Sequence, residues 1–382
     1  MKKVLHITNW YPNEWNLFEG VFVKEQFKLF SQSFETKLIN IQVRDGKSFF
    51  RFKHVKYSED EEAYFLLTKI RSSKIRELFS SLLLIFVLLK SGYRKYDLLH
   101  FHIAYPLLVF YNIWKKIIRI PIVISEHWSA YHYNFYLTES TEKLKRVKGI
   151  FKQNIPIITV SKALLSDIEK FSNTQQHQSV IIPNVIDSEY FRYKESENRS
   201  NKIVFLMVNV WRKIKNPFPI FDALSNINSE IGDFELRIGG YGELMEEMKQ
   251  YVISKKLENK IKFLGKLEKE EIAIQLSGAH AYLFSSDYET FSVACAQALS
   301  CGCPLIGPPL PAILEYAQPD KDILLVSEND EKEWQETITR FMMNISKFKR
   351  SHIAKEASRK FSSENIQTLY ETFIDKTIYK ND

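Results

Sequence analysis

Short apolar runs rich in β-branched residues alternate along the chain with longer stretches of helical spacing. In the first half, six such runs lie at residues 3–9, 36–43, 97–103, 120–127, 155–161 and 179–184. In the second half, six more lie at residues 202–210, 234–240, 261–265, 279–286, 303–308 and 322–328. Runs of this length predict buried strands, and strands that alternate with helices need crossover connections. The pattern therefore predicts an α/β protein with two consecutive, doubly wound parallel sheets.

A polar stretch between the two sets of strands marks a domain boundary. Residues 188–202, SEYFRYKESENRSNK, show no strand pattern and are typical of a linker. We therefore expect one domain over residues 1–190 and a second over residues 191–362, a division that suits a chain of 382 residues. Because doubly wound sheets bind ligands beyond the carboxyl ends of their strands, two facing sheets imply a cleft between them.

Positive charge is concentrated in the first half of the chain. Residues 1–190 hold 27 Lys and Arg against 18 Asp and Glu, a formal +9, and the remainder holds 26 against 28, or −2. A basic half suits nucleic acid, an anionic membrane surface or an acidic substrate, and it is also compatible with an ordinary solvated surface. No zinc-finger spacing, RNP-like aromatic run or basic leucine zipper accompanies it, so we expect no nucleic-acid partner.

One segment favours a membrane surface. Residues 71–96, RSSKIRELFSSLLLIFVLLKSGYRKY, place an apolar core of about 12 residues, 78–89, between cationic flanks. The core is shorter than the ~20 residues that a membrane-spanning helix needs. It predicts either a buried helix of the α/β fold or an interfacial helix, and both remain open. At the N-terminus the apolar run breaks at Asn9 and no small-residue cleavage site follows, so we expect a cytoplasmic protein.

The three cysteines predict neither a disulfide framework nor a metal centre. Cys295, Cys301 and Cys303 lie within nine residues of one another, and no other cysteine exists to join them to a distant segment. Their spacing, with no adjacent His, lacks the usual ligand count of a zinc site. We expect them to be buried small residues.

The stretch DYETFSVACAQALSCGCPLIG, residues 287–307, sets acidic residues before a small, apolar run. The run before it predicts a strand and the spacing after it predicts a helix, so Glu289 is expected at the start of that helix, facing the cleft. Gln297, eight residues later, then lies on a similar face. Such a pair suits the hydroxyls of a sugar and a ribose, although an isolated Glu could equally serve the helix dipole alone.

These motifs resemble those of the retaining glycosyltransferases of family 4, the "group 1" transferases with the GT-B fold, over nearly the full length. In that family a strand ends in Ser-x-x-Glu-x-Phe-Gly, and this Glu opens a Glu-x7-Glu signature before Ala-Cys-Gly-x-Pro-Val-Ile. Here Ser286, Glu289, Phe291 and Ser292 occupy the first pattern, and residues 300–306, SCGCPLI, the last. The resemblance implies that Glu289 binds hydroxyls of the transferred sugar, with Phe291 and Ser292 beside the donor. Gln297 replaces the second carboxylate, and its amide can still bind the ribose.

Further segments of the first half fit the same family. The loop NWYPNEWNLFEG ends at Gly20, before a helix, and resembles the loop that meets the donor phosphate and the acceptor. His127, at the end of a strand, stands where the family has a His near the reacting centre. Residues 181–191, IIPNVIDSEYF, resemble the interdomain hinge, with Val185 in place of a Gly.

Segments of the second half correspond to the donor site. Lys215 matches the Lys that the family uses on the donor pyrophosphate, while Val210 holds the position of the family's Arg and Arg212 is the candidate second cation. Gly240 and Gly242 match a Gly-x-Gly before the next helix, which by itself is a weak signal. Residues 306–317, IGPPLPAILEYA, carry prolines in place of the usual Gly-Gly, so backbone donors are missing there.

The resemblance implies two Rossmann-like domains facing a central cleft, the first for the acceptor and the second for the nucleotide sugar. It also implies a terminal helix over residues 363–382 that returns to the first domain. The expected reaction is retaining, metal-independent hexosyl transfer from a UDP- or GDP-linked sugar to an acceptor hydroxyl, without a cofactor. The acceptor is expected to be lipid-linked or a saccharide in bacterial surface polysaccharide synthesis, with peripheral contact at the inner face of the cytoplasmic membrane. Two alternatives remain: a nucleotide-sugar epimerase of similar fold, and a non-catalytic subunit that binds a nucleotide sugar.

Overall fold

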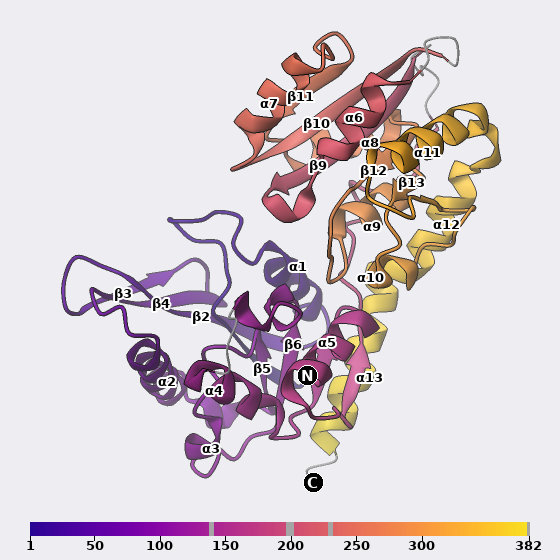
Figure 1. Cartoon of the computed structure of the whole chain (residues 1–382). Coiled ribbons are helices and arrows are strands. Elements are labelled where there is room, and N and C mark those ends of the chain that lie inside the picture. Colours follow the sequence, from indigo (N-terminus) through magenta and orange to yellow (C-terminus); the bar gives the residue numbers. More distant parts are fainter. Residues whose placement is uncertain (137–140, 196–201, 228–231, 380–382) are drawn as a thin grey trace. The chain divides into compact units, whose positions relative to one another are not determined.

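The structure, a computed structural model, describes residues 1–136, 141–195, 202–227 and 232–379 (Figure 1). The chain divides into two compact units. Unit 1 comprises Met1–Asn184 and Ile366–Asp382, and unit 2 comprises Val185–Asn365. The polar stretch predicted as a linker contains no strand among residues 188–195, and residues 196–201 lie outside the described residues.

Unit 1 contains an eight-stranded sheet in the order β3-β4-β2-β1-β5-β6-β7-β8. The strands are β1 (Lys3–Thr8), β2 (Glu35–Asp45), β3 (Arg51–Lys56), β4 (Glu61–Thr68), β5 (Leu98–His102), β6 (Ile122–Glu126), β7 (Ile157–Thr159) and β8 (Ser179–Ile181). All six strands predicted for this half are present. The prediction of a wholly parallel sheet was wrong at one edge, because β3 and β4 form an antiparallel pair. The exposed residues of β3 alternate with partly buried ones, so β3 lacks the continuous apolar run of a buried parallel strand.

Helices cover the faces of the unit 1 sheet. They are α1 (Val21–Phe30), α2 (Ser73–Lys90), α3 (Tyr111–Trp114), α4 (Glu142–Phe151), α5 (Lys162–Ser172) and α13 (Ser363–Tyr379). Short 3-10 turns are η1 (Tyr93–Lys95), η2 (Ser129–Tyr131) and η3 (Asn134–Tyr136). From Ile366 onward α13 belongs to unit 1, where the Tyr370 ring lies 4.4 Å from that of Phe30 and Lys2 pairs with Asp375 at 2.6 Å. The C-terminal helix thus completes the core of the N-terminal sheet.

Unit 2 contains a six-stranded parallel sheet in the order β11-β10-β9-β12-β13-β14. The strands are β9 (Ile203–Trp211), β10 (Phe234–Gly242), β11 (Ile261–Gly265), β12 (Ala281–Leu283), β13 (Leu305–Gly307) and β14 (Ile323–Leu325). All six match the predicted runs. Counted from β9, the order is third, second, first, fourth, fifth, sixth, which is the doubly wound order of dinucleotide-binding sheets. The direction of winding reverses between β9 and β12, the point at which such sheets bind ligands.

The helices of unit 2 connect these strands. They are α6 (Phe218–Ser225), α7 (Met245–Ser254), α8 (Lys269–Gly278), α9 (Val293–Ser300), α10 (Pro311–Leu314), α11 (Glu331–Met343) and α12 (Arg350–Phe361), with 3-10 turns η4 (Lys213–Lys215) and η6 (Ile345–Lys347). The prediction that the cysteines are buried is confirmed for Cys295, Cys301 and Cys303.

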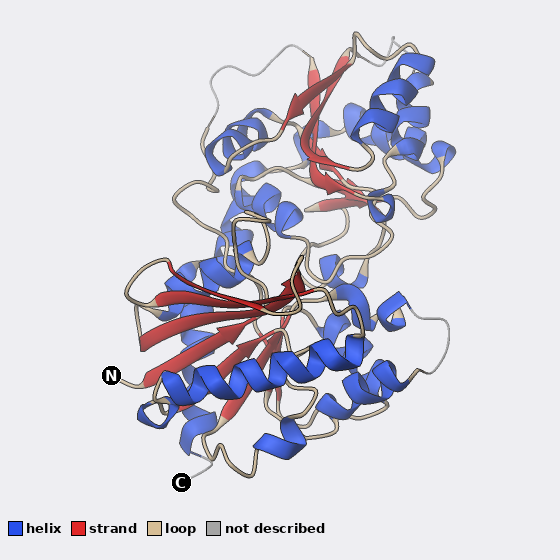
Figure 2. Cartoon of the chain, turned by 90° about the vertical axis from the view of Figure 1, so that its left-hand side faces the viewer, coloured by secondary structure: helices blue, strands red, loops and turns tan. Residues whose placement is uncertain are grey.

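The apolar segment predicted as either a core helix or an interfacial helix forms α2. One face of α2 packs on the sheet, and Leu84, Val87 and Leu88 there are almost fully buried. The opposite face points away from the sheet, along the outside of unit 1 (Figure 2). Within the described part of the chain, every helix is too short or too polar to cross a membrane.

Candidate active site

The loops that leave β9 and β12 bring two predicted residues together at the point where the unit 2 sheet reverses. Lys215 closes η4, directly after β9, and Glu289 lies in the loop after β12. Lys215 Nζ lies 2.5 Å from Glu289 Oε1, although the two residues are 74 positions apart. Both side chains keep partial access to solvent, at 18% and 13% exposure. A cation and a carboxylate are therefore available to a ligand that enters here.

Neighbouring serines fix the two loops that carry this pair. Ser286 Oγ donates to Glu289 Oε1 at 2.8 Å, and Ser285 Oγ donates to the carbonyl of Lys215 at 2.8 Å. The backbone N–H of Asp287 donates to the carbonyl of Ile214 at 2.9 Å. Because Ser285 and Ser286 are nearly fully buried, these bonds hold the carboxylate in one orientation before any ligand arrives.

Helix α9 begins later than the sequence suggests. It starts at Val293, so the prediction that Glu289 opens the helix was wrong. Ser292 precedes the helix with φ 64 and ψ 85, in the left-handed region, and a turn of this kind keeps the helix from starting earlier. The family motif has Gly at this position, which adopts that conformation without strain. Gln297 is half-buried and lies in the second turn of α9, beyond the loop that carries Glu289.

Phe291 supports the loop from inside. Its side chain is buried against Tyr316 and Phe361, with ring centroids 5.3 and 5.6 Å away. The hydroxyl of Tyr316 donates to the carbonyl of Phe291 at 2.7 Å. The structure thus places the Phe291 ring in the core, where it positions the loop instead of lining an open site.

Gly240 and Gly242 are explained by the backbone of the neighbouring strand. Both have positive φ, and an added Cβ would lie 1.9 Å from the carbonyl oxygen of Asn209 or 2.3 Å from that of Trp211. Close pairing of β10 with β9 therefore requires glycine at both positions, whether or not a ligand is bound. Arg212 directly precedes η4 and is exposed. Burial raises the pKa of the nearby Tyr241, and the positive charge of Arg212 partly opposes this rise.

In unit 1, a cavity of about 460 Å³ opens where its own sheet reverses, between β1 and β5. Asn9 and Trp10 line it from the loop after β1, and Tyr105 lines it from the loop after β5. Asn9 Nδ2 donates to the carbonyl of Tyr105 at 3.1 Å, while Asn9 Oδ1 is buried without a hydrogen-bond partner. Arg44 and Arg76 also line the cavity, each in an ion pair with a carboxylate. Aromatic and polar groups of this kind commonly line small-molecule sites.

The loop predicted to meet the donor phosphate and the acceptor folds back on itself. Gly20, at the start of α1, has φ 63, and a Cβ there would lie 2.2 Å from the carbonyl oxygen of Trp10. Glu19 accepts hydrogen bonds from Asn13, Gln42 and Arg44 at 2.5, 3.2 and 3.1 Å. The loop is thus fixed next to the cavity, and only glycine fits at position 20.

His127 follows β6 and is buried, at 8% exposure. Neither ring nitrogen has a hydrogen-bond partner, and the ring lies 4.3 Å from that of Phe22. Burial and the nearby His102 hold the pKa of His127 well below its usual value, so the imidazole is neutral. A neutral, unpartnered imidazole can donate one hydrogen bond and accept another, which suits a ligand hydroxyl.

Glu126, beside His127, was not singled out from the sequence. It is fully buried, and its Oε1 accepts from the backbone N–H of Ala104 at 2.7 Å and from the Tyr131 hydroxyl at 2.6 Å. Burial raises its pKa to about 7. Ile103, directly before Ala104, has φ 67, a strained conformation for a β-branched residue. Glu126 therefore fixes a strained, buried turn directly before Tyr105, which lines the cavity. In the sequence, only a Glu within an otherwise apolar strand pointed to this role.

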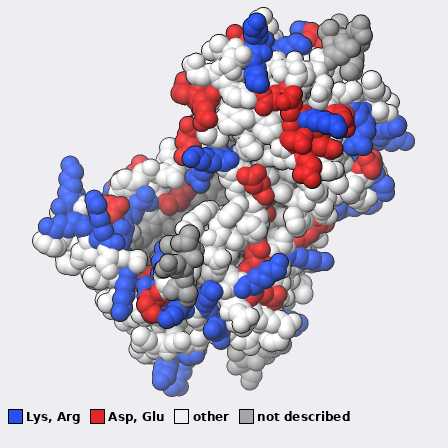
Figure 3. Space-filling view, viewed as in Figure 1, with Lys and Arg blue, Asp and Glu red and all other residues white. Residues whose placement is uncertain are grey.

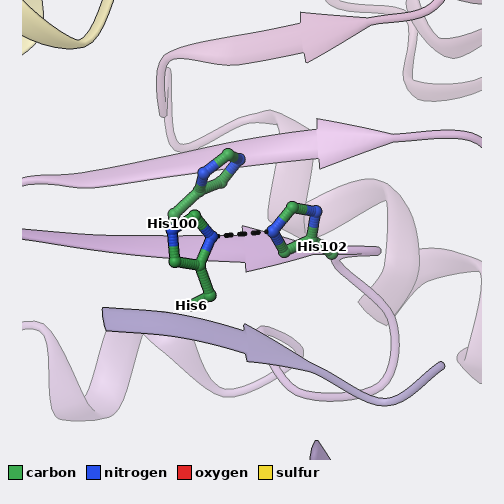
Figure 4. Close-up of side chains that lie close together, drawn as sticks. All are labelled: His6, His100 and His102. Atoms are coloured by element: carbon green, nitrogen blue, oxygen red, sulfur yellow. Dashed lines mark hydrogen bonds between the residues drawn. The ribbon is translucent and has the colours of Figure 1, made fainter. Parts of the chain in front are cut away.

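Three further histidines form a buried cluster, which we call the histidine trio: His6, His100 and His102 (Figure 4). His6 Nδ1 lies 3.0 Å from His102 Nε2, and His100 Nε2 lies 2.7 Å from Ser125 Oγ. One candidate ligand atom from each lies within 4.8 Å of the others, a grouping that the sequence analysis did not foresee. Burial lowers the pKa of all three, that of His102 to about 3. Rings of Phe27 and Phe30 pack against His6, so the trio is embedded in the core.

Comparison with known proteins agrees with this arrangement. Residues 191–361 match the profile described as "Glycosyl transferases group 1", and residues 57–190 match that of "Glycosyltransferase Family 4". The chain is 24% identical over 231 residues to N-acetyl-alpha-D-glucosaminyl L-malate synthase of Bacillus anthracis, a match that covers 58% of this chain and 59% of the relative. It is 27% identical over 274 residues to the O-antigen chain mannosyltransferase RfbU of Salmonella typhimurium, a match that covers 70% of this chain and 72% of the relative.

A solved structure shows the same fold. HepE of Anabaena, in complex with UDP and glucose, superimposes with a TM-score of 0.74 at 16% identity, covering 98% of this chain and all of that one. Two doubly wound α/β units with functional groups where each sheet reverses define a glycosyltransferase of the GT-B fold. The chain belongs to the group 1 glycosyl transferases of family 4.

Proposed function

We propose that the protein transfers a sugar from a nucleotide-sugar donor to an acceptor hydroxyl with retention of anomeric configuration. The observation that carries this proposal is the pair Lys215–Glu289, where the unit 2 sheet reverses. It is a partly exposed cation and carboxylate, and both belong to motifs that the family uses on the donor. The complex of HepE with UDP and glucose supports a donor of this class.

The two residues of the pair are proposed to bind different parts of the donor. The ammonium of Lys215 is suited to the pyrophosphate, and the Glu289 carboxylate to hydroxyls of the sugar. Donor phosphate would draw Lys215 away from Glu289 and leave the carboxylate free to accept from the sugar. The N-terminal amides of α9 and Arg212 supply further positive potential, and Gln297 is the proposed ribose contact. Cationic groups thus take the role that a divalent metal has in other transferases, and we propose metal-independent transfer without a cofactor.

Retention follows if the acceptor attacks from the face that the leaving phosphate vacates, with the phosphate accepting the acceptor proton. The protein then contributes mainly position and charge. Such a reaction needs no strongly basic side chain, in accord with the neutral imidazole of His127. His127 is proposed to hydrogen-bond the transferred sugar, and the Gly20 loop to meet the phosphate and the acceptor.

We assign the acceptor to the unit 1 cavity beside Trp10 and Tyr105. A saccharide, free or lipid-linked, fits its aromatic and polar lining. RfbU is an O-antigen chain mannosyltransferase, which supports a place in bacterial surface polysaccharide synthesis. We therefore propose a cytoplasmic enzyme in peripheral contact with the membrane that carries its acceptor.

The test is a donor screen followed by analysis of the product. UDP- and GDP-sugars are incubated with mono- and disaccharide acceptors, with and without a chelator, and the anomeric configuration of the product is read by NMR. Retained configuration, with activity unchanged by the chelator, supports the proposal. An acceptor-independent change of the sugar would identify an epimerase instead. Tight nucleotide binding with no turnover of any donor would identify a non-catalytic subunit.

A further inference from the structure

The outer face of α2 is apolar, whereas the outer face of a surface helix is usually polar. The inward face of α2 carries the buried Leu84, Val87 and Leu88, and towards the start of the helix it also buries Glu77 and the two serines 80 and 81. Its outward face carries Ile75, Leu78, Leu82, Phe86 and Leu89, each between 39% and 62% exposed. These five positions recur at helical spacing, and residues 78–89 contain no charged side chain. A stripe of exposed apolar side chains of this kind is typical of an interaction surface.

The inward polar groups of α2 are already satisfied within unit 1. Glu77 pairs with Arg146 at 2.6 Å and accepts from the Tyr105 hydroxyl at 3.0 Å. Ser80 donates to the carbonyl of Arg76 at 2.9 Å. The helix is therefore fixed in this rotation, and its apolar stripe does not result from a helix that could simply turn over.

The apolar surface continues beyond α2 onto the edge of the sheet. Phe49, Phe50 and Phe52, just before and within β3, are all about half exposed or more. The Phe50 ring lies 5.4 Å from that of Phe79, and the Phe52 ring lies 6.1 Å from that of Phe86. We call this continuous surface of α2 and β3 the apolar face.

Cations border the apolar face. Lys69 lies 3.4 Å from the ring centre of Phe49, and Lys90 lies 6.0 Å from that of Phe86. Arg71 and Lys74 stand at the start of α2. In Figure 3, Lys and Arg side chains gather at the left-hand edge, over β3 and β4. An apolar centre with a cationic border matches the acyl region and the anionic headgroups of a lipid surface.

We infer that the apolar face docks unit 1 onto an anionic lipid bilayer, with α2 lying in the interface. A second copy of the chain fits this surface less well. If two copies of α2 paired in antiparallel fashion, the cations at the start of one helix would face those at the end of the other. If they paired in parallel, each cation would face its own copy. Both arrangements bring like charges together and are repulsive. The start of α2 also borders the acceptor cavity through Ser73 and Arg76, so docking would bring that cavity to the level of the headgroups.

This inference rests on the proposed function only for the identity of the acceptor, and it can be tested separately. The full chain is sedimented with vesicles of phosphatidylcholine alone and with phosphatidylglycerol added, at low and high salt. We expect association with the anionic vesicles that weakens as salt rises. The triple variant Leu78→Gln, Leu82→Gln, Leu89→Gln should lose at least tenfold in vesicle affinity while its thermal unfolding is unchanged, because these side chains are exposed.

A matched control exists in unit 2. Ile253, Ile274 and Met343 are 52%, 68% and 66% exposed, and replacing all three by Gln removes similar exposed apolar groups away from the proposed face. The control variant should bind vesicles as the wild type does. The double variant Lys74→Gln, Lys90→Gln should bind less to anionic vesicles and show a weaker salt dependence.

Three outcomes would overturn the inference: wild-type protein that ignores anionic vesicles at low salt, equal losses in the triple and the control variants, or a dimer in sedimentation velocity that the triple variant abolishes. Transfer to a water-soluble acceptor is measured on the same preparations. Transfer without vesicle binding defeats only the docking, and vesicle binding without transfer to any acceptor defeats only the proposed function.

Discussion

The two units use the same place in the sheet for different chemistry. In unit 2, the loops at the point of reversal end in an opposite charge pair, Lys215 and Glu289, held ready by serines. In unit 1, the cavity at the corresponding point is lined by aromatic rings and by ion-paired arginines, and the buried, neutral His127 follows the next strand, β6. A charged pair suits a ligand with phosphate, whereas neutral groups suit hydroxyls. The difference supports the proposal that unit 2 binds the phosphate of the donor.

The largest expected effect concerns acid stability, which should separate the units. The trio and His127 are buried in unit 1 with a pKa below the value of about 6.5 that they have when unfolded. Below that pH the unfolded chain binds protons that the native chain does not, so stability falls as pH falls. Each such histidine costs about 2 kcal/mol between pH 7 and 5.

Glu126 acts in the opposite sense. Its pKa is raised to about 7, so the native chain keeps a proton that the unfolded chain loses above its own lower pKa. It offsets part of the loss from the four histidines, so the net effect is still a loss of stability as pH falls. Hydrogen exchange on the full chain at pH 7, 6 and 5 measures this. Unit 1 peptides should lose protection first; earlier loss in unit 2 would contradict the account.

The next effect tests the charge pair. Glu289→Ala should lower kcat/KM for transfer by more than tenfold, which is above about 1.4 kcal/mol, because in the proposed mechanism the carboxylate contacts the sugar as the bond breaks. Affinity for the free nucleoside diphosphate should stay nearly unchanged. Lys215→Ala should instead weaken diphosphate binding. Steady-state kinetics and calorimetry separate the two, and equal losses of both quantities in Glu289→Ala would show a structural role.

Much of the fold could be predicted from the sequence, because buried parallel strands are continuous apolar runs. Strand β3 was missed because four of its six residues are exposed and leave no such run. Strand β4 does contain an apolar run, residues 63–67, which the sequence analysis did not single out. The predicted start of α9 was also wrong. Ser292 adopts a left-handed conformation that delays the helix, and the sequence has no glycine there that would have indicated such a turn. Local backbone conformation of this kind depends on the surrounding packing and leaves little trace in the pattern.

The sequence predicted residues of the candidate site, but it did not predict which of them contact one another. Resemblance to the family supplied Lys215 and Glu289 separately, but their 2.5 Å contact depends on the order of β9 and β12 in the sheet. The histidine trio needed the register of β1 against β5, which pairs His6 with His100. Such a register is set by long-range packing, and a single sequence contains no direct record of it.

A smaller effect concerns the strained turn before α9. Ser292→Gly should stabilise the protein by roughly 0.5–1 kcal/mol, because glycine adopts the left-handed conformation without the cost borne by a side chain. Ser292→Ala keeps a Cβ and should bring no gain, which makes it the matched control. Chemical denaturation of the three proteins measures the difference. If both variants are destabilised alike, the serine hydroxyl matters more than the backbone strain.

The smallest expected effect concerns Gln297, the departure from the family carboxylate. In α9 this side chain is half-buried, so a charged replacement keeps access to solvent and to the electropositive start of the helix. A carboxylate accepts from both hydroxyls of a ribose, whereas the amide offers one acceptor and two donors. Gln297→Glu should therefore retain nucleotide affinity or tighten it up to a few fold, with the same melting temperature. Titration calorimetry with UDP and GDP measures the affinity, and Gln297→Met, of similar size but unable to bond the ribose, is the control. Loss of folding in Gln297→Glu would place the side chain in the core and remove it from the donor site.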